Sequence, residues 1–257
     1  MKISRWFILM VFLLLIIMQT AQAHFQTLIP NQSIVVSADQ GSIDLKMTFT
    51  HPMERGPLMN MGEPLQFGVR TPTGKRSLLD SLVSSSIGGM TGYSAEYSLQ
   101  APGDHTFFIE PAPYWEPSES KMIIHYTKVV VNGFGLEQGW DEPVGLPVEI
   151  DPLVRPYGLW TGNIFRGVVL RDGAPVPGAE VEVEWLNDGS VEAPSSPFVT
   201  QVIRADAQGV FSYAIPRAGW WGFAALTEAE APMSNPNGVD VPVEEGGLIW
   251  VHAVDMR

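Results

Sequence analysis

Hydrophobic and polar residues alternate along many short segments of this chain, which is the pattern of half-buried β-strands. The clearest case is residues 42–50, where the apolar positions are Ile43, Leu45, Met47 and Phe49. Further strands are predicted at 93–99, 105–110, 121–131, 163–170, 179–186, 200–205, 210–215, 220–226 and 248–254. No window carries the apolar stripe of an amphipathic helix, so the sequence predicts an all-β fold.

Turn sequences separate these strands. Pro102 and Gly103 lie between two of them, and a hairpin is predicted there because proline fixes φ and glycine accepts positive φ. A second set of strands begins after residue 152. We therefore predict two Ig-like β-sandwich domains, at 24–151 and 152–257. The alternating glutamates of 180–184 are interpreted as the solvent face of a strand.

Residues 1–23 have the features of an export signal. Lys2 and Arg5 precede an apolar run at 6–18, and a small-x-small cleavage site ends at Ala23. The apolar run is shorter than the roughly 20 residues that span a bilayer, and no later stretch is as apolar. We therefore predict cleavage after Ala23 and a periplasmic mature chain that does not span the membrane.

Composition excludes several classes of function. The 28 acidic residues outnumber the 15 basic ones, for a net charge of −13, which argues against nucleic acid as a partner. The chain has no cysteine, which removes disulfides, thiol nucleophiles and cysteine-type metal sites. It also lacks a Gly-x-Ser-x-Gly elbow, a phosphate-binding glycine loop and a His-Glu-x-x-His motif, so we predict that it is not an enzyme.

The histidines are the candidate metal ligands. Cleavage after Ala23 would make His24 the first residue, whose α-amino group and imidazole can close a chelate on one metal ion. His51 follows the strand at 42–50 on the parity of its apolar face, and His125 lies within the strand at 121–131. Imidazole suits nickel, cobalt, copper and zinc. Since these residues are far apart in sequence, their site must be assembled from separate strands.

Other residues leave alternatives open. Met53, Met59 and Met61 follow His51 and are either soft thioether ligands or apolar filler of an irregular loop. His51 is either a ligand or a partly buried histidine bonded to a backbone carbonyl. His105 is a fourth histidine of the first domain, and whether it joins the site is left open.

Two further function classes compete with metal binding. Aromatic and acidic loops at 111–117 and 140–143 are typical of a non-catalytic carbohydrate-binding or adhesion sandwich. A copper ion held by His24 and a second histidine would instead support oxidation.

Several longer segments together resemble a family of exported bacterial proteins. They are Ala23-His24-Phe25-Gln26, Phe49-Thr50-His51-Pro52-Met53, Pro113-Tyr114-Trp115-Glu116-Pro117, Ile124-His125-Tyr126-Thr127-Lys128, Gly139-Trp140-Asp141-Glu142-Pro143 and Ala218-Gly219-Trp220-Trp221-Gly222. The family is described as the periplasmic component of a cobalt or nickel uptake system of the energy-coupling-factor type, and many members carry only an unknown-function label.

The resemblance implies a divalent nickel or cobalt ion as the substrate and the subunits of a membrane nickel/cobalt transporter as partners. The motif histidines of the family fall on His24, His51 and His125. Nitrogen sites bind copper(II) more tightly than nickel(II) or cobalt(II), so copper binding is expected in vitro. The second half is similar to the carboxypeptidase-regulatory-like sandwiches of other exported proteins, which implies a presenting or spacing role for it.

Overall fold

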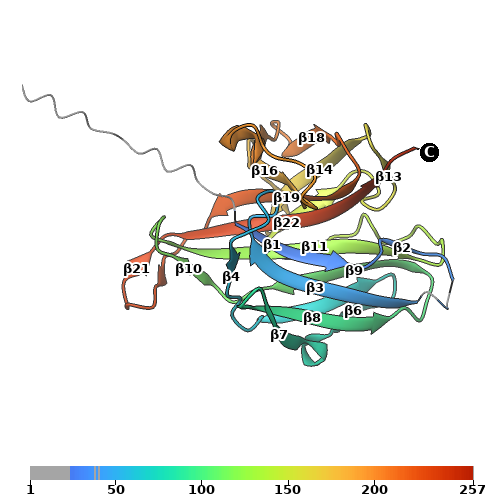
Figure 1. Ribbon diagram of the computed structural model, residues 1–257, viewed down its shortest axis with the longest axis horizontal. Helices are drawn as coiled ribbons and strands as arrows, with labels where there is room; N and C mark the ends of the chain where they lie inside the picture. The colour runs from blue at the N-terminus through green and yellow to red at the C-terminus, as the bar shows by residue number, and fades with distance from the viewer. Residues whose placement is uncertain (1–23, 38, 40, 257) are drawn as a thin grey trace, which may run out of the picture.

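Extended strands make up the computed structural model, which describes residues 24–37, 39 and 41–256 (Figure 1). The predicted signal peptide at 1–23 and its cleavage site lie outside the described residues. No α-helix occurs among the described residues, and the short 3-10 turns Leu79–Ser81 and Ser196–Phe198 interrupt the strands. The prediction of an all-β sandwich fold is confirmed.

The strands of the described residues form four sheets. The first consists of β1 (Phe25–Pro30), β3 (Ser42–Thr50), β8 (Met90–Ser98) and β7 (Val83–Ile87), with β4 (Leu58–Met59) beside β3. The second runs in the order β17 (Gln201–Arg204), β16 (Glu180–Trp185), β19 (Gly219–Glu228), β22 (Val243–Val254), β11 (Lys121–Gly133), β9 (Gly103–Glu110), β5 (Gln66–Thr71) and β6 (Gly74–Ser77).

Short strands complete the second sheet, namely β10 (Tyr114–Glu116) and β2 (Ile34–Val35) beside β11 and β13 (Leu159–Trp160) beside β22. The third sheet is β12 (Val148–Pro152), β14 (Ile164–Arg171) and β15 (Ala174–Pro175), with β18 (Val210–Ala214) also paired to β14. The last is the small hairpin of β20 (Met233–Ser234) and β21 (Asp240–Val241).

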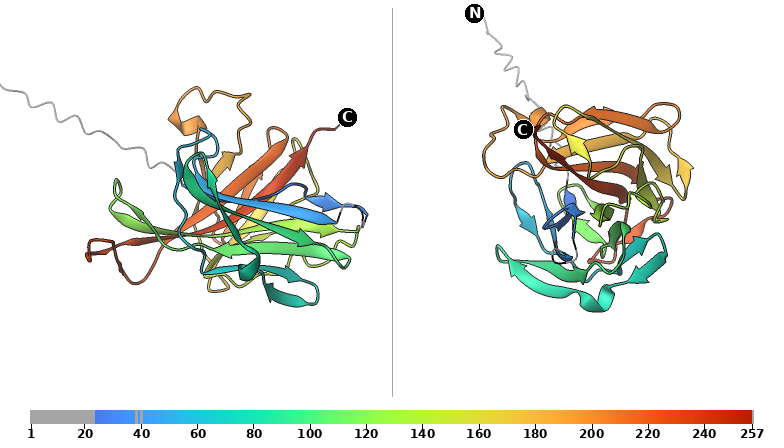
Figure 2. Two further views of the ribbon diagram at one scale, coloured as in Figure 1. Left: turned by 60° about the horizontal axis from the view of Figure 1, so that its bottom comes forward. Right: turned by 90° about the vertical axis from the view of Figure 1, so that its right-hand side faces the viewer.

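The second sheet runs through both halves of the chain. Its centre is a parallel pair of long strands, β11 from the first half and β22 from the second, in register from Met122 opposite Val243 to Val129 opposite Trp250. In the sheet order, β9, β5 and β6 of the first half lie beyond β11, and β19, β16 and β17 of the second half lie beyond β22 (Figures 1 and 2). The division of the chain at 151/152 stays a prediction, but the two halves share one sheet.

The described residues form three clusters of buried apolar side chains, and the two larger ones share strand β22. The first packs sheet one against β11, β9 and β5, and it includes Leu45, Phe107 and, from the second half, Trp250. The second packs β12, β14 and β18 against β16, β19 and β22 around Phe165 and Phe223. Alternate residues of β22 enter different cores, because successive side chains of a strand point to opposite faces. Strand β22 therefore joins the two sandwiches.

A buried ion pair fixes the connection between the halves. The Lys128 ammonium lies 2.6 Å from a carboxylate oxygen of Glu149, and each side chain is 2% exposed. The Glu149 carboxylate also accepts hydrogen bonds from the backbone N–H groups of Val144, Gly145 and Leu146. Burial would raise the pKa of Glu149, but Lys128 and these donors outweigh it and lower the pKa below its ordinary value.

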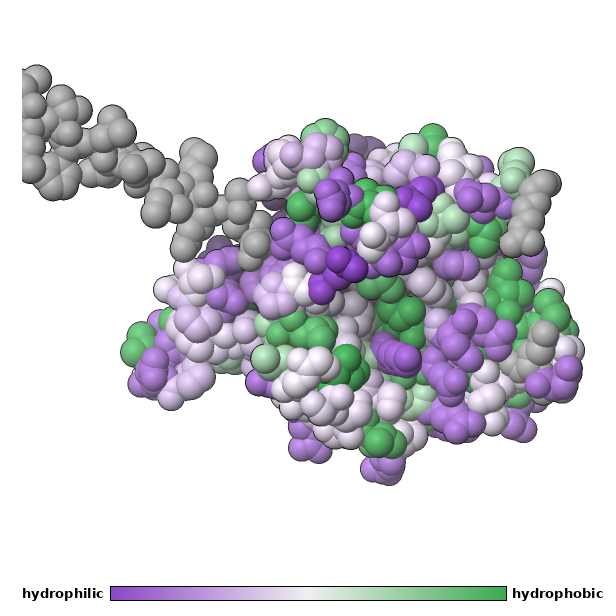
Figure 3. All heavy atoms as spheres, viewed as in Figure 1, coloured by the Kyte–Doolittle hydropathy of each residue, from purple (hydrophilic) through white to green (hydrophobic). Residues whose placement is uncertain are grey.

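The outer surface is mixed in character. On the face drawn in Figure 3, hydrophobic residues are interspersed with hydrophilic ones. Among the described residues, no helix has the length and apolar character needed to cross a membrane.

Candidate metal centre

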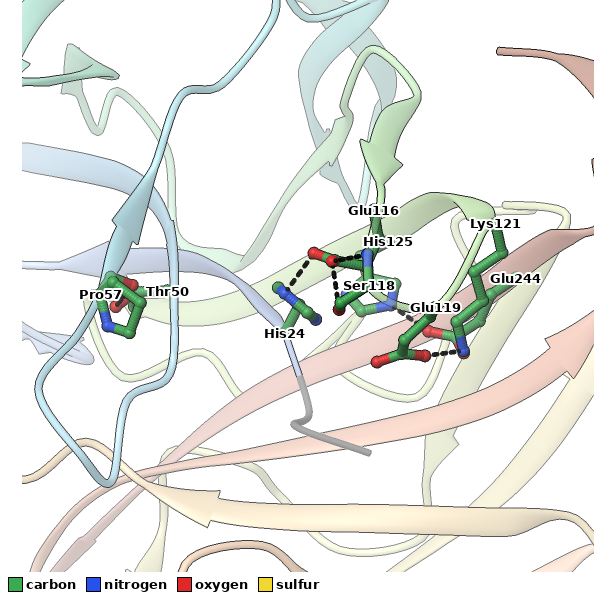
Figure 4. Close-up of polar contacts among 9 residues, drawn as sticks. All are labelled: His24, Thr50, Pro57, Glu116, Ser118, Glu119, Lys121, His125 and Glu244. Atoms are coloured by element: carbon green, nitrogen blue, oxygen red, sulfur yellow. Dashed lines mark hydrogen bonds and ion pairs between the residues drawn. The ribbon is translucent and has the colours of Figure 1, made fainter. Parts of the chain in front are cut away.

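The three predicted ligand histidines come together at one end of the first sandwich, and Figure 4 shows His24 and His125 with the side chains that contact them. His24 precedes β1 and His51 follows β3, and these strands pair so that Phe25 lies opposite Thr50. The register therefore brings the two histidines side by side, with ring centroids 4.7 Å apart. The predicted proximity of these residues is present, whereas their role as metal ligands stays a prediction.

His125 reaches the same place from β11. The Phe49 ring lies between the histidines, 5.5 Å from the His24 ring and 5.8 Å from the His125 ring by centroid. All three histidines are buried, with His51 and His125 each 2% exposed. The parity argument that placed His51 on the apolar face of its strand is therefore confirmed.

A glycine makes room for His125. Gly246 lies opposite His125 in the β11–β22 register. A Cβ atom at Gly246 would lie 2.6 Å from the Cδ2 atom of His125, closer than real Cβ contacts allow. The imidazole of His125 therefore lies directly over the backbone of β22, and any side chain at 246 would displace it.

Glu116 orients the imidazole of His24. Its carboxylate lies 3.0 Å from Nε2 of His24 and also accepts hydrogen bonds from the backbone N–H and the hydroxyl of Ser118. Burial alone would raise the pKa of Glu116, but these bonds and His24 lower it, so the carboxylate is ionised and only accepts. Nε2 of His24 therefore carries the hydrogen, and Nδ1 keeps its lone pair.

Glu244 makes the corresponding contact with His125. Its carboxylate lies 3.3 Å from Nε2 of His125 and also forms an ion pair with Lys121. Burial would raise the pKa of Glu244, but His125 and Lys121 outweigh it and hold the pKa at about 2. Nδ1 of His125 is buried and has no hydrogen-bond partner within the described part of the chain.

The site keeps the imidazole of His24 neutral. Burial and the neighbouring His51 lower its pKa to about 4, since both disfavour a positive charge, and the opposing pull of Glu116 is weaker. At neutral pH this ring is therefore a lone-pair donor. An imidazole in that state can bind a metal without first losing a proton.

A small cavity of about 10 Å³ borders His125, which is room for about one water molecule. Its lining includes His125, Phe49, Tyr114 and Met61. The Tyr114 ring lies 6.0 Å from the His24 ring, so this aromatic residue of the predicted carbohydrate-binding loop faces the histidine cluster.

The methionines divide between different parts of the molecule. Met61 is buried beside the cavity, and its sulfur accepts a hydrogen bond from the side chain of Gln26. Met59 packs on the first core, and Met53 packs against the core of the second half. Met53 is held there because its backbone N–H donates to Glu184 of β16.

The other histidines lie elsewhere. His105 lies near the first residue of β9, and its Nδ1 lies 3.1 Å from the carbonyl oxygen of Gly103. His252 contacts the hydroxyl of Ser33 and the ring of Trp220.

The histidine cluster is not a finished metal site as it stands. Among the described residues, no three side chains of His, Cys, Asp or Glu are arranged so that they could hold a metal ion. The rings of His24 and His51 are tilted by 52° and are neighbours rather than convergent ligands. A three-histidine site therefore requires rotation of at least one ring, or a donor that is not a side chain.

The glutamates of β16 correct one interpretation. They were expected to form a solvent face, but Glu182 and Glu184 are only 7% and 1% exposed, and Glu180 alone is exposed. The loop after His51 covers this face, since Met53 donates its N–H to Glu184. Burial raises the pKa of Glu182 to about 8 and that of Glu184 to about 7, and the charge of Glu244 contributes to the shift at Glu182.

Sequence reasoning missed Glu116 and Glu244 as partners of the histidines. Glu116 lies two residues after Tyr114 in β10, so the two side chains share a face of the strand. The sequence Tyr114-Trp115-Glu116 could therefore have indicated Glu116 as a partner of the site. No sequence pattern could have indicated Glu244, because it meets His125 only through the parallel pairing of β11 with β22.

Comparison with known proteins gives one family match. A family described as "Domain of unknown function (DUF4198)" matches residues 21–229. No curated protein matches the chain.

Solved structures resemble the chain only distantly. Trypsin-activated alpha-2-macroglobulin from Escherichia coli is 14% identical with a TM-score of 0.26, covers 89% of this chain, and is matched over 16% of its own length. A putative carbohydrate binding protein from Bacteroides uniformis is 10% identical with a TM-score of 0.23, and the match covers 78% of this chain and 94% of that one. Domains A168–A170 of titin are 8% identical with a TM-score of 0.21, covering 88% and 68%. These values carry no argument about function.

Proposed function

The chain belongs to the DUF4198 family, and from its histidine cluster we propose that it is a periplasmic, non-catalytic protein that binds a divalent nickel or cobalt ion. We propose further that it delivers this ion to the subunits of a membrane nickel/cobalt transporter. The metal is the cargo of the protein, and His24, His51 and His125 are its proposed ligands.

One observation carries the proposal, the contact between Nε2 of His24 and Glu116. Because the Glu116 carboxylate accepts a hydrogen bond from the N–H group at Nε2, the lone pair of the ring is on Nδ1. Nδ1 is the ring nitrogen that can close a chelate with the α-amino group of the same residue. The tautomer set by Glu116 is thus the one that an amino-terminal histidine needs for metal binding.

His125 supports the proposal in the same way. Its Nε2 faces Glu244, and its buried Nδ1 lacks a partner among the described residues. Metal-bound histidines commonly give their other ring N–H to a carboxylate, which fixes the ring and raises its basicity. His24 and His125 each have such a carboxylate.

The proposed ligand set includes a nitrogen that is not a side chain. After cleavage behind Ala23, the α-amine of His24 would add a donor to the imidazoles. The amine would supply a donor that the side chains alone do not, because no three metal-binding side chains are suitably arranged among the described residues. Processing would then create the metal site.

The test compares nickel binding by calorimetry in three proteins, the mature chain that starts at His24, the same chain with one glycine added before His24, and His24→Ala. The mature chain is expected to bind one nickel ion at micromolar or lower concentration. The glycine extension and His24→Ala should each weaken binding by about tenfold or more, or about 1.4 kcal/mol. His105→Ala is the matched control, because it removes a buried histidine outside the cluster.

Two outcomes would contradict the proposal. Absence of saturable binding at micromolar nickel and cobalt would remove the function. Equal affinity of the native and glycine-extended proteins would show that the α-amine is not a ligand. In vitro affinities should fall from copper(II) to nickel(II) to cobalt(II), as nitrogen sites generally do.

A further inference from the structure

A second hollow, of about 260 Å³, lies between the turn that joins β5 to β6 and the turn before β9. In Figure 1, β6 is at the right of the molecule, whereas β4 and β10 beside the histidine cluster are at the left. The hollow is therefore separate from the proposed metal centre. Its lining includes Lys75 and Arg76 but no acidic residue, in a chain of net charge −13.

Arg76 supplies the charge of this hollow. The carbon of its guanidinium lies 5.3 Å from the centre of the Tyr97 ring. Within the described part of the chain, Arg76 forms no ion pair with an acidic residue. The N–H groups of a guanidinium lie in one plane, in a fork that matches the two oxygens of a carboxylate.

His105 supplies an acceptor. Its side chain is 2% exposed, lines the hollow, and packs against Tyr97 with ring centroids 5.8 Å apart. Burial lowers the pKa of His105, so the ring is neutral. Nδ1 donates to the carbonyl oxygen of Gly103 at 3.1 Å, which leaves Nε2 as a lone-pair acceptor.

We propose that this hollow binds a small organic acid that carries a hydroxyl or ammonium donor next to its carboxylate. Arg76 would receive the carboxylate, Nε2 of His105 would accept the hydrogen of the neighbouring donor, and Tyr97, Pro72 and Pro102 would cover the hydrocarbon part. The volume lies just below the roughly 300 Å³ at which pockets for larger ligands begin, which favours a ligand of a few carbon atoms.

The test uses two acids that differ by one hydroxyl group, 2-hydroxy-4-methylpentanoate and 4-methylpentanoate. Each is titrated into the isotope-labelled mature protein at physiological salt, without metal, and NMR shifts are followed. The hydroxy acid should give saturable shifts at residues of the hollow, including the ring nitrogens of His105. It should bind about fivefold or more tightly than its hydroxyl-free partner, about 1 kcal/mol for a hydrogen bond to a buried acceptor.

Matched variants distinguish a specific binding site from nonspecific electrostatic attraction. Arg76→Gln should weaken binding of both acids by about tenfold or more. Lys75→Gln removes the same charge from the neighbouring residue, whose ammonium lies 5.9 Å from the Phe108 ring, and should weaken binding far less than Arg76→Gln. His105→Phe should abolish the preference for the hydroxy acid while carboxylate binding remains.

The absence of saturable shifts for either acid up to about 20 mM would overturn the proposal. Equal losses in Arg76→Gln and Lys75→Gln would also overturn it, because they would indicate nonspecific attraction. Neither outcome bears on metal binding, since the titrations contain no metal.

Discussion

Replacing Glu182 by glutamine should make the protein more stable at alkaline pH. The Glu182 side chain is 7% exposed, and no described residue donates a hydrogen bond to its carboxylate. Burial, with the charges of Glu244 and Glu184, raises its pKa to about 8. The ionised form is therefore disfavoured in the folded protein.

The sign of the effect follows from proton linkage. The folded pKa of about 8 is above the ordinary value of 4.5, so the folded state holds this proton more tightly than the unfolded state. The contribution to stability is complete below about pH 4.5 and is lost progressively as the pH rises through 8. Glutamine cannot ionise, so the variant should not lose this contribution.

The magnitude is bounded by the size of the shift. At 1.36 kcal/mol for each pH unit, the shift sets an upper limit of about 5 kcal/mol on the cost of ionised Glu182. Water penetration and side-chain relaxation reduce such costs, so we expect Glu182→Gln to gain about 2–4 kcal/mol over wild type at pH 9. At pH 5 the two proteins should have nearly equal free energies of unfolding.

The assay is denaturant unfolding followed by circular dichroism at unit steps from pH 5 to 9. Glu180→Gln is the control, because Glu180 lies on the same face of β16 but is exposed and paired with Arg204. The difference between Glu182→Gln and wild type should grow with pH, whereas that of the control should stay flat. A flat difference for Glu182→Gln would refute the reasoning, since it would show that the carboxylate is solvated in the folded protein.

Three further predictions follow from other contacts. Gly246→Ala should weaken nickel binding by about tenfold, because the new Cβ atom would displace His125. Gly158→Ala is the control and should not change the nickel titration, because a Cβ atom there has only ordinary contact distances. Lys128→Met should lower the free energy of unfolding by about 3–5 kcal/mol, measured by urea denaturation, because it leaves Glu149 buried without its cation. Nickel at about 100 times its dissociation constant should stabilise the mature protein by about 2.7 kcal/mol in thermal melts, and no shift would contradict metal binding to the folded state.

The fold could be predicted for strands in which apolar and polar residues clearly alternate. The alternation of 42–50 predicted β3 with its buried face, and the proline and glycine before residue 105 predicted the turn into β9. The position of His51 followed from the same alternation, because parity within one strand fixes the face of a side chain. These features depend on residues that are close in sequence.

Features that depend on distant pairing could not be predicted. The parallel contact of β11 with β22 brings together residues about 120 positions apart, and it places Glu244 beside His125. The alternation of 180–184 is the same whether the polar face meets water or another segment. The loop that carries Met53 contacts Glu184, and this contact between distant segments leaves no trace in the alternation.

The position of the histidine cluster connects its chemistry to the assembly of the whole chain. His24 and His51 come from the first sheet, His125 comes from the sheet that both halves share, and Glu244 comes from the second half. A ligand that binds only the folded state stabilises every contact that forms its site. Metal bound as we propose would therefore hold the first strand, the loop after His51 and the shared sheet together. Loss of the ion to a transporter should release the same contacts, so the metal-free protein should show faster hydrogen exchange in β1 and in the loop at 51–57 than the nickel-bound protein.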